Sequence, residues 1–109
     1  MIQITHVEQV ALPGHKLRYR LQDDVLTATL ERPDGTSLEE QYDLSGLQPG
    51  DEVAWVEPEV LPFSPLISAR RDESGVLHFH LLLWYEGELN MDQAIAEAWP
   101  EGAPEVSNG

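Results

Sequence analysis

The run VLHFHLLLWY, residues 76–85, constrains the fold of this chain more than any other stretch. Successive side chains of a β-strand point to opposite faces, so every second residue shares a face. One face of this run is apolar apart from a tyrosine hydroxyl and carries Leu77, Phe79, Leu81, Leu83 and Tyr85. The other face carries Val76, His78, His80, Leu82 and Trp84. Large apolar residues on both faces predict a strand that packs on a core and is partly covered on its second side as well.

The chain before this run reads as shorter strands separated by turns. The segment KLRYRL, residues 16–21, alternates apolar and basic side chains, and residues 25–31 follow it after a short acidic turn. Two such runs joined by a short turn predict a hairpin. Pro33 and Gly35 predict the next turn, because proline presets φ for the first central position and glycine accepts positive φ.

Residues 37–44 and 52–56 predict two more strands. In the first of them an apolar phase begins at Leu38 and returns at Tyr42, but Glu40 interrupts it.

The segment EPEVLPFSPL, residues 57–66, contains three prolines. Proline lacks a backbone N–H and biases the residue before it toward extended geometry. We therefore expect an extended strap that crosses one domain. After it, residues 66–85 predict a second hairpin that turns at residues 72–75.

A helix is predicted after residue 90. Asn90 can cap its first turn, and Gln93 is placed to reciprocate as a capping-box partner. Pro100 ends the segment. The apolar residues fall on one face at helical spacing, and they are Met91, Ala94, Ile95, Ala98 and Trp99.

These elements fit one domain, since the chain has 109 residues. We expect a mainly-β fold over residues 1–100, a small antiparallel meander or sandwich of about six to seven strands with one C-terminal α-helix. Residues 101–109 contain proline, glycine and acids with little to bury, which predicts a flexible acidic tail.

The charge of the chain limits its partners. There are 20 acidic residues against 6 basic ones, a formal net charge of −14. Phosphates and anionic lipids repel such a chain, so we expect neither direct nucleic-acid binding nor membrane binding. No run approaches the length of a membrane span, and residues 1–10 lack the pattern of a signal peptide, so the expected compartment is the cytoplasm.

An alternative hypothesis starts from the acids of residues 31–59, where the only base is Arg32. A solvated surface accounts for such a cluster. A ranked face of carboxylates would instead make the protein a DNA mimic, an inhibitor of a basic nucleic-acid-binding protein.

Metal binding is a second alternative. His78 and His80 point to the same side of their strand, with Cα atoms roughly 6.5–7 Å apart. Two imidazoles at that spacing can share a metal ion, but a competent site needs at least a third ligand. His6 and His15 are the histidines that could approach in the fold. Without one of them, the pair is an ordinary feature of a half-exposed strand face.

Motifs for catalysis are absent from the sequence. There is no nucleophile elbow, no phosphate-binding loop, no dinucleotide fingerprint and no zinc-protease pair, and there is no cysteine. We therefore expect a non-enzymatic protein without a cofactor.

The face that carries His78, His80, Leu82 and Trp84 is the candidate for function. It is more apolar than a solvent face should be, so the strap with its Phe63, the helix or another subunit is expected to cover it. If another subunit does, this face is an interaction face for a protein partner, and a homodimer is one such arrangement.

The layout also resembles small proteins of unknown function encoded among phage and prophage tail genes. The shared features are an opening strand (MIQITHV), the turn YDLSGLQPGDEV, the hairpin LISARRDESGVLHFHLLL and an acidic tail. The resemblance implies a compact β-rich accessory or assembly factor and assigns no functional residues. The sequence thus favours a small acidic interaction or assembly-accessory module.

Overall fold

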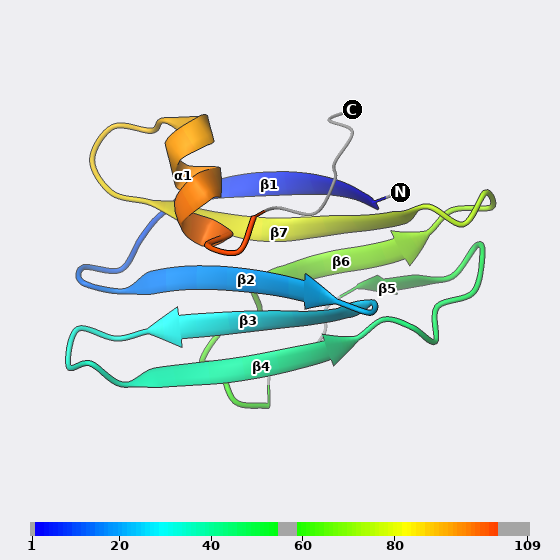
Figure 1. The fold of residues 1–109 in the computed structure, drawn as a ribbon, viewed down its shortest axis with the longest axis horizontal. Coiled ribbons are helices and arrows are strands. Elements are labelled where there is room, and N and C mark those ends of the chain that lie inside the picture. Colours follow the sequence, from blue (N-terminus) through cyan, green and yellow to red (C-terminus); the bar gives the residue numbers. More distant parts are fainter. Residues whose placement is uncertain (1, 55–58, 103–109) are drawn as a thin grey trace.

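The computed structural model describes residues 2–54 and 59–102 of the chain. Within these residues seven strands form two sheets, and one helix follows the last strand (Figure 1). The elements are β1 (Ile2–Val10), β2 (Lys16–Gln22), β3 (Val25–Glu31), β4 (Ser37–Asp43), β5 (Glu52–Ala54), β6 (Leu66–Arg71), β7 (Leu77–Tyr85) and α1 (Met91–Ala98). The mainly-β fold with a C-terminal helix that the sequence predicts is confirmed. The predicted tail lies outside the described residues from residue 103 onward.

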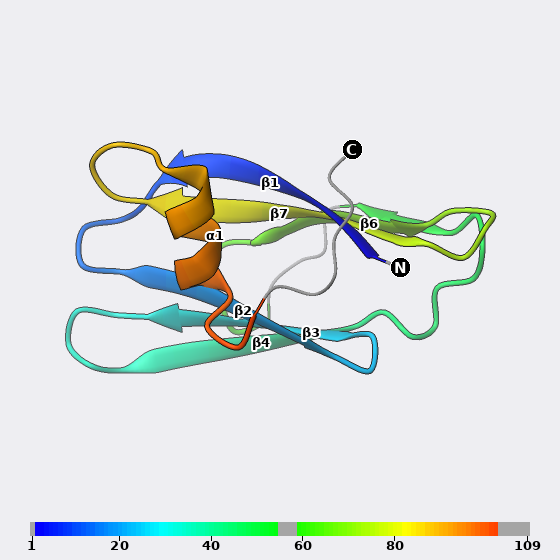
Figure 2. The ribbon, with the colours of Figure 1, turned by 45° about the horizontal axis from the view of Figure 1, so that its top comes forward.

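The two sheets form separate layers, and α1 lies at one side of them (Figure 2). One sheet has the strand order β1-β7-β6-β5 and the other has the order β2-β3-β4. Both predicted hairpins are present, as the antiparallel pairs β2–β3 and β6–β7.

The pairing of β1 with β7 departs from the antiparallel arrangement expected from the sequence. These strands run parallel, from Ile2 opposite Leu77 to Val10 opposite Tyr85. Parallel neighbours require a long crossover connection, and here the crossover contains all the other strands. Local alternation says which face of a strand is buried but not which distant strand lies beside it.

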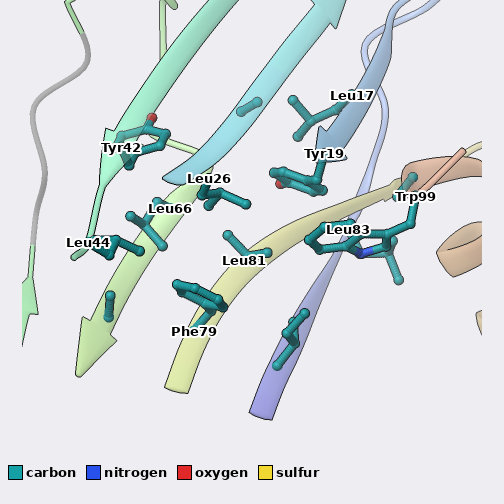
Figure 3. Close-up of a cluster of buried hydrophobic side chains, with 14 of the residues drawn as sticks. Leu17, Tyr19, Leu26, Tyr42, Leu44, Leu66, Phe79, Leu81, Leu83 and Trp99 are labelled. Carbon is teal, nitrogen blue, oxygen red and sulfur yellow. The ribbon is translucent and has the colours of Figure 1, made fainter. Parts of the chain in front are cut away.

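The core lies between the two sheets (Figure 3). The apolar face of β7 supplies its centre, because Phe79, Leu81 and Leu83 are all completely buried. From the three-stranded sheet, Leu26 and Tyr19 pack against them from the opposite layer.

A proline beside β7 leaves one backbone carbonyl without its usual partner, and Tyr19 supplies the missing donor. The β6–β7 register pairs Leu66 with Leu81, so the next pair is Pro65 with Leu82. Leu82 donates its N–H to the carbonyl of Pro65, but proline has no N–H to return. The hydroxyl of Tyr19 donates to the Leu82 carbonyl instead. This hydrogen bond ties the two sheets together.

The strap is held by the residue that interrupts the apolar phase of β4. Glu40 points into the sandwich and is only 6% exposed. Its Oε1 accepts hydrogen bonds from three consecutive backbone N–H groups, those of Glu59 (2.9 Å), Val60 (2.8 Å) and Leu61 (3.1 Å). A buried carboxylate is stable when several donors surround it. Glu40 is therefore the anchor of the described strap, residues 59–65.

Helix α1 begins as the sequence predicts, with one difference in its cap. The side chain of Asn90 accepts a hydrogen bond from the N–H of Gln93 at 3.2 Å. The side chain of Gln93 does not return to the cap. It donates to Glu97 Oε1 at 3.4 Å, one turn further on, so the predicted capping box is wrong.

Trp99 fastens the end of the helix to both sheets. Its side chain is 3% exposed and packs on Tyr19, with ring centroids 5.4 Å apart. Its indole N–H donates to Nε2 of His6 on β1 at 3.2 Å. Because the indole nitrogen can only donate, Nε2 of His6 must be unprotonated in this arrangement.

The His6–Trp99 contact predicts a loss of stability in mild acid. Burial lowers the pKa of His6 below its usual value of 6.5, and the nearby Glu8 carboxylate opposes this only in part. As the pH falls below 6.5, the unfolded chain therefore takes up a proton at His6 that the folded chain does not. Above pH 6.5 the contribution of His6 to stability should be fully present. As the pH falls from 6.5 to the folded pKa of His6, the free energy of unfolding should decrease.

Urea unfolding at a series of pH values on both sides of neutrality measures this slope. His6→Gln keeps an acceptor for the indole but cannot titrate, so its slope should be shallower than that of the wild type. His15→Gln, at a half-buried position away from the His6–Trp99 contact, is the control and should keep the wild-type slope. An unchanged slope in His6→Gln would contradict the assignment.

Candidate interaction face

The four-stranded sheet turns one side away from the core, and we call the side chains there the outward face. Strand pairing assigns its members, because residues opposite each other in neighbouring strands point to the same side of the sheet. Its central column is the four β7 residues of the sequence prediction, His78, His80, Leu82 and Trp84. Its flanking columns contain Gln3, Thr5, Val7 and Gln9 of β1 and Ile67, Ser68 and Arg70 of β6.

One end of the outward face is aromatic. Continuing the β6–β7 register places Phe63 of the strap beside Trp84, and the two rings stack with centroids 5.0 Å apart. The indole N–H of Trp84 donates to Oε1 of Gln9 on β1 at 2.9 Å. Both rings are only half-buried, so they keep a surface that another molecule can cover.

The middle of the outward face is apolar and partly exposed. Val7 lies opposite Leu82, and Leu82 is half-buried. Val7 and Ile67 are each 38% exposed. Ile67 lies at a shift in the β6–β7 register, which adds a residue to β6 at this level. His80, also in this middle part, is exposed.

The other end of the outward face is polar. Nε2 of His78 lies 2.9 Å from Oδ2 of Asp72 in the β6–β7 turn, and the imidazole side chain is 14% exposed. Hydrogen bonds from Ser74, then His78 and the N–H of Val76, hold the pKa of Asp72 well below its usual range. Asp72 is thus a fixed anion that orients His78.

Arg70 completes this end. It is exposed and lies between His78 of β7 and Glu52 of β5 in the strand register.

Carboxylates are absent from the outward side of three strands. In β1, β6 and β7, all of which the structure describes, no residue with its side chain on this face is an aspartate or a glutamate. The fourth strand differs, because Glu52 of β5 lies opposite Arg70 and so on the same side of the sheet. Asp72 in the β6–β7 turn borders the face and pairs with His78. In a chain with 20 acids, such a surface stands apart from the rest of the molecule.

The exposed side of the three-stranded sheet has the opposite character. Arg18 of β2 forms a salt bridge with Glu31 of β3 at 2.8 Å, and both side chains are more than a third exposed. Glu39 and Asp43 of β4 lie on the same side. Mixed charges of this kind are typical of a solvent face.

The described acids of residues 31–59 are divided among different environments. Glu40 is buried under the strap. Asp34, Asp43 and Asp51 accept hydrogen bonds from Thr36, Ser45 and Gln48 in their own turns. The arrangement gives the DNA-mimic hypothesis no specific support.

His78 and His80 are not joined by further metal ligands. Among residues 2–54 and 59–102, no group of three or more His, Asp or Glu side chains is arranged to hold a metal ion. His6 contacts Trp99, and His15 Nδ1 lies 3.0 Å from the carbonyl of Pro13. The structure thus brings neither histidine to the pair on β7.

Sequence reasoning identified the central column of the outward face but missed its neighbours. Val7 and Ile67 belong to strands whose place beside β7 only the tertiary structure gives. Phe63 was expected in the strap as a residue that could cover this face, and its ring stacks on Trp84.

The part of the chain that the structure describes contains no helix long and apolar enough to cross a membrane. Comparisons of the chain with protein-family models, with curated proteins and with solved structures found no match.

Proposed function

We propose that this protein is a small, acidic, non-enzymatic interaction module that binds a protein partner through the outward face. The observation that carries the proposal is the absence of carboxylates from the outward side of β1, β6 and β7. Its accessory role in a larger assembly is part of the same proposal.

The composition of the outward face supports this function. The centres of protein interfaces are depleted in charged residues and enriched in aromatic residues, because a carboxylate that loses its water without gaining a partner is costly. Trp84 and Phe63 form an aromatic pair there, and Leu82, Val7 and Ile67 continue the apolar surface. A solvent face has no need to exclude acids, whereas a face that is covered in a complex does.

The charge of the chain favours a protein over a nucleic acid as the partner. At a net charge of −14 the protein is repelled by phosphates at long range. The outward face contributes only Arg70 as a permanent cation from β1, β6 and β7, too little to reverse that repulsion.

Photo-crosslinking in the producing cell tests the proposal. A photoreactive phenylalanine at the exposed position His80 should form covalent adducts with protein. The same residue at Gln41, exposed on the far sheet, should form few or none. Mass spectrometry of the adducts identifies what was captured. Equal yields at the two positions, or no adduct from His80, would overturn the proposal.

A further inference from the structure

The outward face has unlike ends, and this makes it complementary to itself. The aromatic end holds Phe63 and Trp84, while the polar end holds Arg70 and His78. His78 and Trp84 are six positions apart along β7, a distance of roughly 20 Å at about 3.3 Å per residue. The apolar middle lies between them, near His80 and Leu82.

We propose that the partner of the outward face is a second copy of this chain. The two copies are related by a two-fold axis that lies between the facing sheets and runs across their strands. This inference rests on the proposed function and names its partner. Such an axis stacks β7 on β7 in opposite directions, so the aromatic end of each copy lies over the polar end of the other.

The contacts at the two ends then match chemically. Arg70 of one copy faces Phe63 of the second copy, because both belong to the column that continues β6. A guanidinium over an aromatic face is attracted by its quadrupole. His78 faces Trp84 of the second copy, because both residues belong to the β7 column and the two β7 strands run in opposite directions. Each contact occurs twice, as a two-fold interface requires.

An axis parallel to the strands would not give this match. It would place polar end on polar end, and would set the Asp72–His78 pair of one copy near that of the other. It would also stack β1 on β6, so that Arg70 lay over the Gln3 column rather than over an aromatic ring. The axis across the strands is therefore the one that the side chains favour.

Charge also favours a second copy over a basic protein as the occupant. A basic partner would gain most from a surface that presents carboxylates, and the outward face excludes them from three strands. Two chains of charge −14 repel each other, and the approach that removes carboxylates from the contact minimises that repulsion. Added salt should then strengthen the association, because screening weakens the remaining long-range repulsion.

The size of the outward face indicates a reversible dimer. Strands of nine residues span roughly 30 Å, and three strands are about 14 Å wide. The product of these dimensions is a flat area of roughly 420 Å², which is less than the accessible area of the side chains that protrude from it. This flat area is below the ~800 Å² that each partner usually buries in a stable protein interface. We therefore expect a dimer that dissociates on dilution.

Sedimentation velocity of the purified chain over a hundredfold range of concentration tests self-association. The wild type should pass from monomer to dimer, and at higher salt the midpoint should move to lower concentration. His80→Glu places two carboxylates beside the axis and should weaken the dimer at least about tenfold, or 1.4 kcal/mol. Gln41→Glu adds the same charge on the far sheet and should leave the midpoint near that of the wild type.

Cysteine pairs test the axis, because the chain has no cysteine of its own. The proposed axis brings Gln3 of β1 over Gln9 of the second copy. A mixture of Gln3→Cys and Gln9→Cys chains should therefore be joined by a short bis-maleimide, while each variant alone should not. A mixture that stays unlinked would overturn the proposal.

The remaining outcomes separate this inference from the proposed function. A chain that stays monomeric at every concentration, or a dimer indifferent to His80→Glu, overturns self-association. If cellular crosslinks from position 80 then lead to a different protein, the interaction module stands and its partner is not a second copy. If position 80 yields no adduct in cells, the proposed function fails as well.

Discussion

Replacing Glu40 with alanine should lower the free energy of unfolding by about 2–4 kcal/mol, although this buried side chain is not part of the outward face. Three backbone N–H groups of the strap lose their acceptor in this variant. An unsatisfied buried donor costs about 1–3 kcal/mol, and the N–H groups of the more exposed Glu59 and Val60 can recover part of that from water. The N–H of Leu61 is buried, so water cannot replace the lost hydrogen bond there.

Glu40→Gln is the matched control for this prediction. Its amide oxygen can accept from the same N–H groups, so only the assistance of the charge is lost, which should cost about 1 kcal/mol. Urea unfolding measures both variants, and hydrogen exchange of residues 59–61 shows whether the strap has been released. An alanine variant as stable as the glutamine variant would show that the strap needs no acceptor at this position.

Replacing Trp99 with alanine should cost about 3–5 kcal/mol, the usual range for removing a buried aromatic side chain. The variant loses the packing on Tyr19 and the hydrogen bond to His6 together. Helix α1 has eight residues, too few to be stable alone, so its order depends on contacts with the sheets.

The expected signature of Trp99→Ala is therefore local as well as global. Amide exchange in Met91–Ala98 should accelerate more than exchange in the centre of β7, which keeps its core contacts. Trp99→Phe retains most of the packing and should cost clearly less. Equal protection of the helix in the alanine variant and the wild type would show that Ala94 and Ala98 suffice to hold it.

The sequence was sufficient for the features that depend on neighbouring residues. Alternation in KLRYRL and in residues 76–85 identified strands and their buried faces, and Asn90 identified the start of the helix. These predictions work because side-chain direction in a strand and the capping of a helix are settled within a few residues.

Features that depend on distant residues were beyond the sequence. Glu40 read as an interruption of a strand, because its three donors lie about twenty residues further along the chain. The outward face was seen as one column of four residues. Its absence of carboxylates emerges only when β1 and β6 are placed beside β7. Pairing between strands far apart in sequence leaves little trace in local alternation.

The parallel pairing of β1 with β7 also bears on how the chain folds during synthesis. In the described sheet β1 has β7 as its neighbour, so its backbone groups have no partner there until the ribosome has made the last strand. The three-stranded sheet, built from consecutive strands, can assemble long before that. Closing a contact across nearly the whole described chain is slow, because the entropy of loop closure must be overcome first. Of the described strands, β1 is thus made first and is among the last to be paired, so until then its backbone groups are open to water or to another chain.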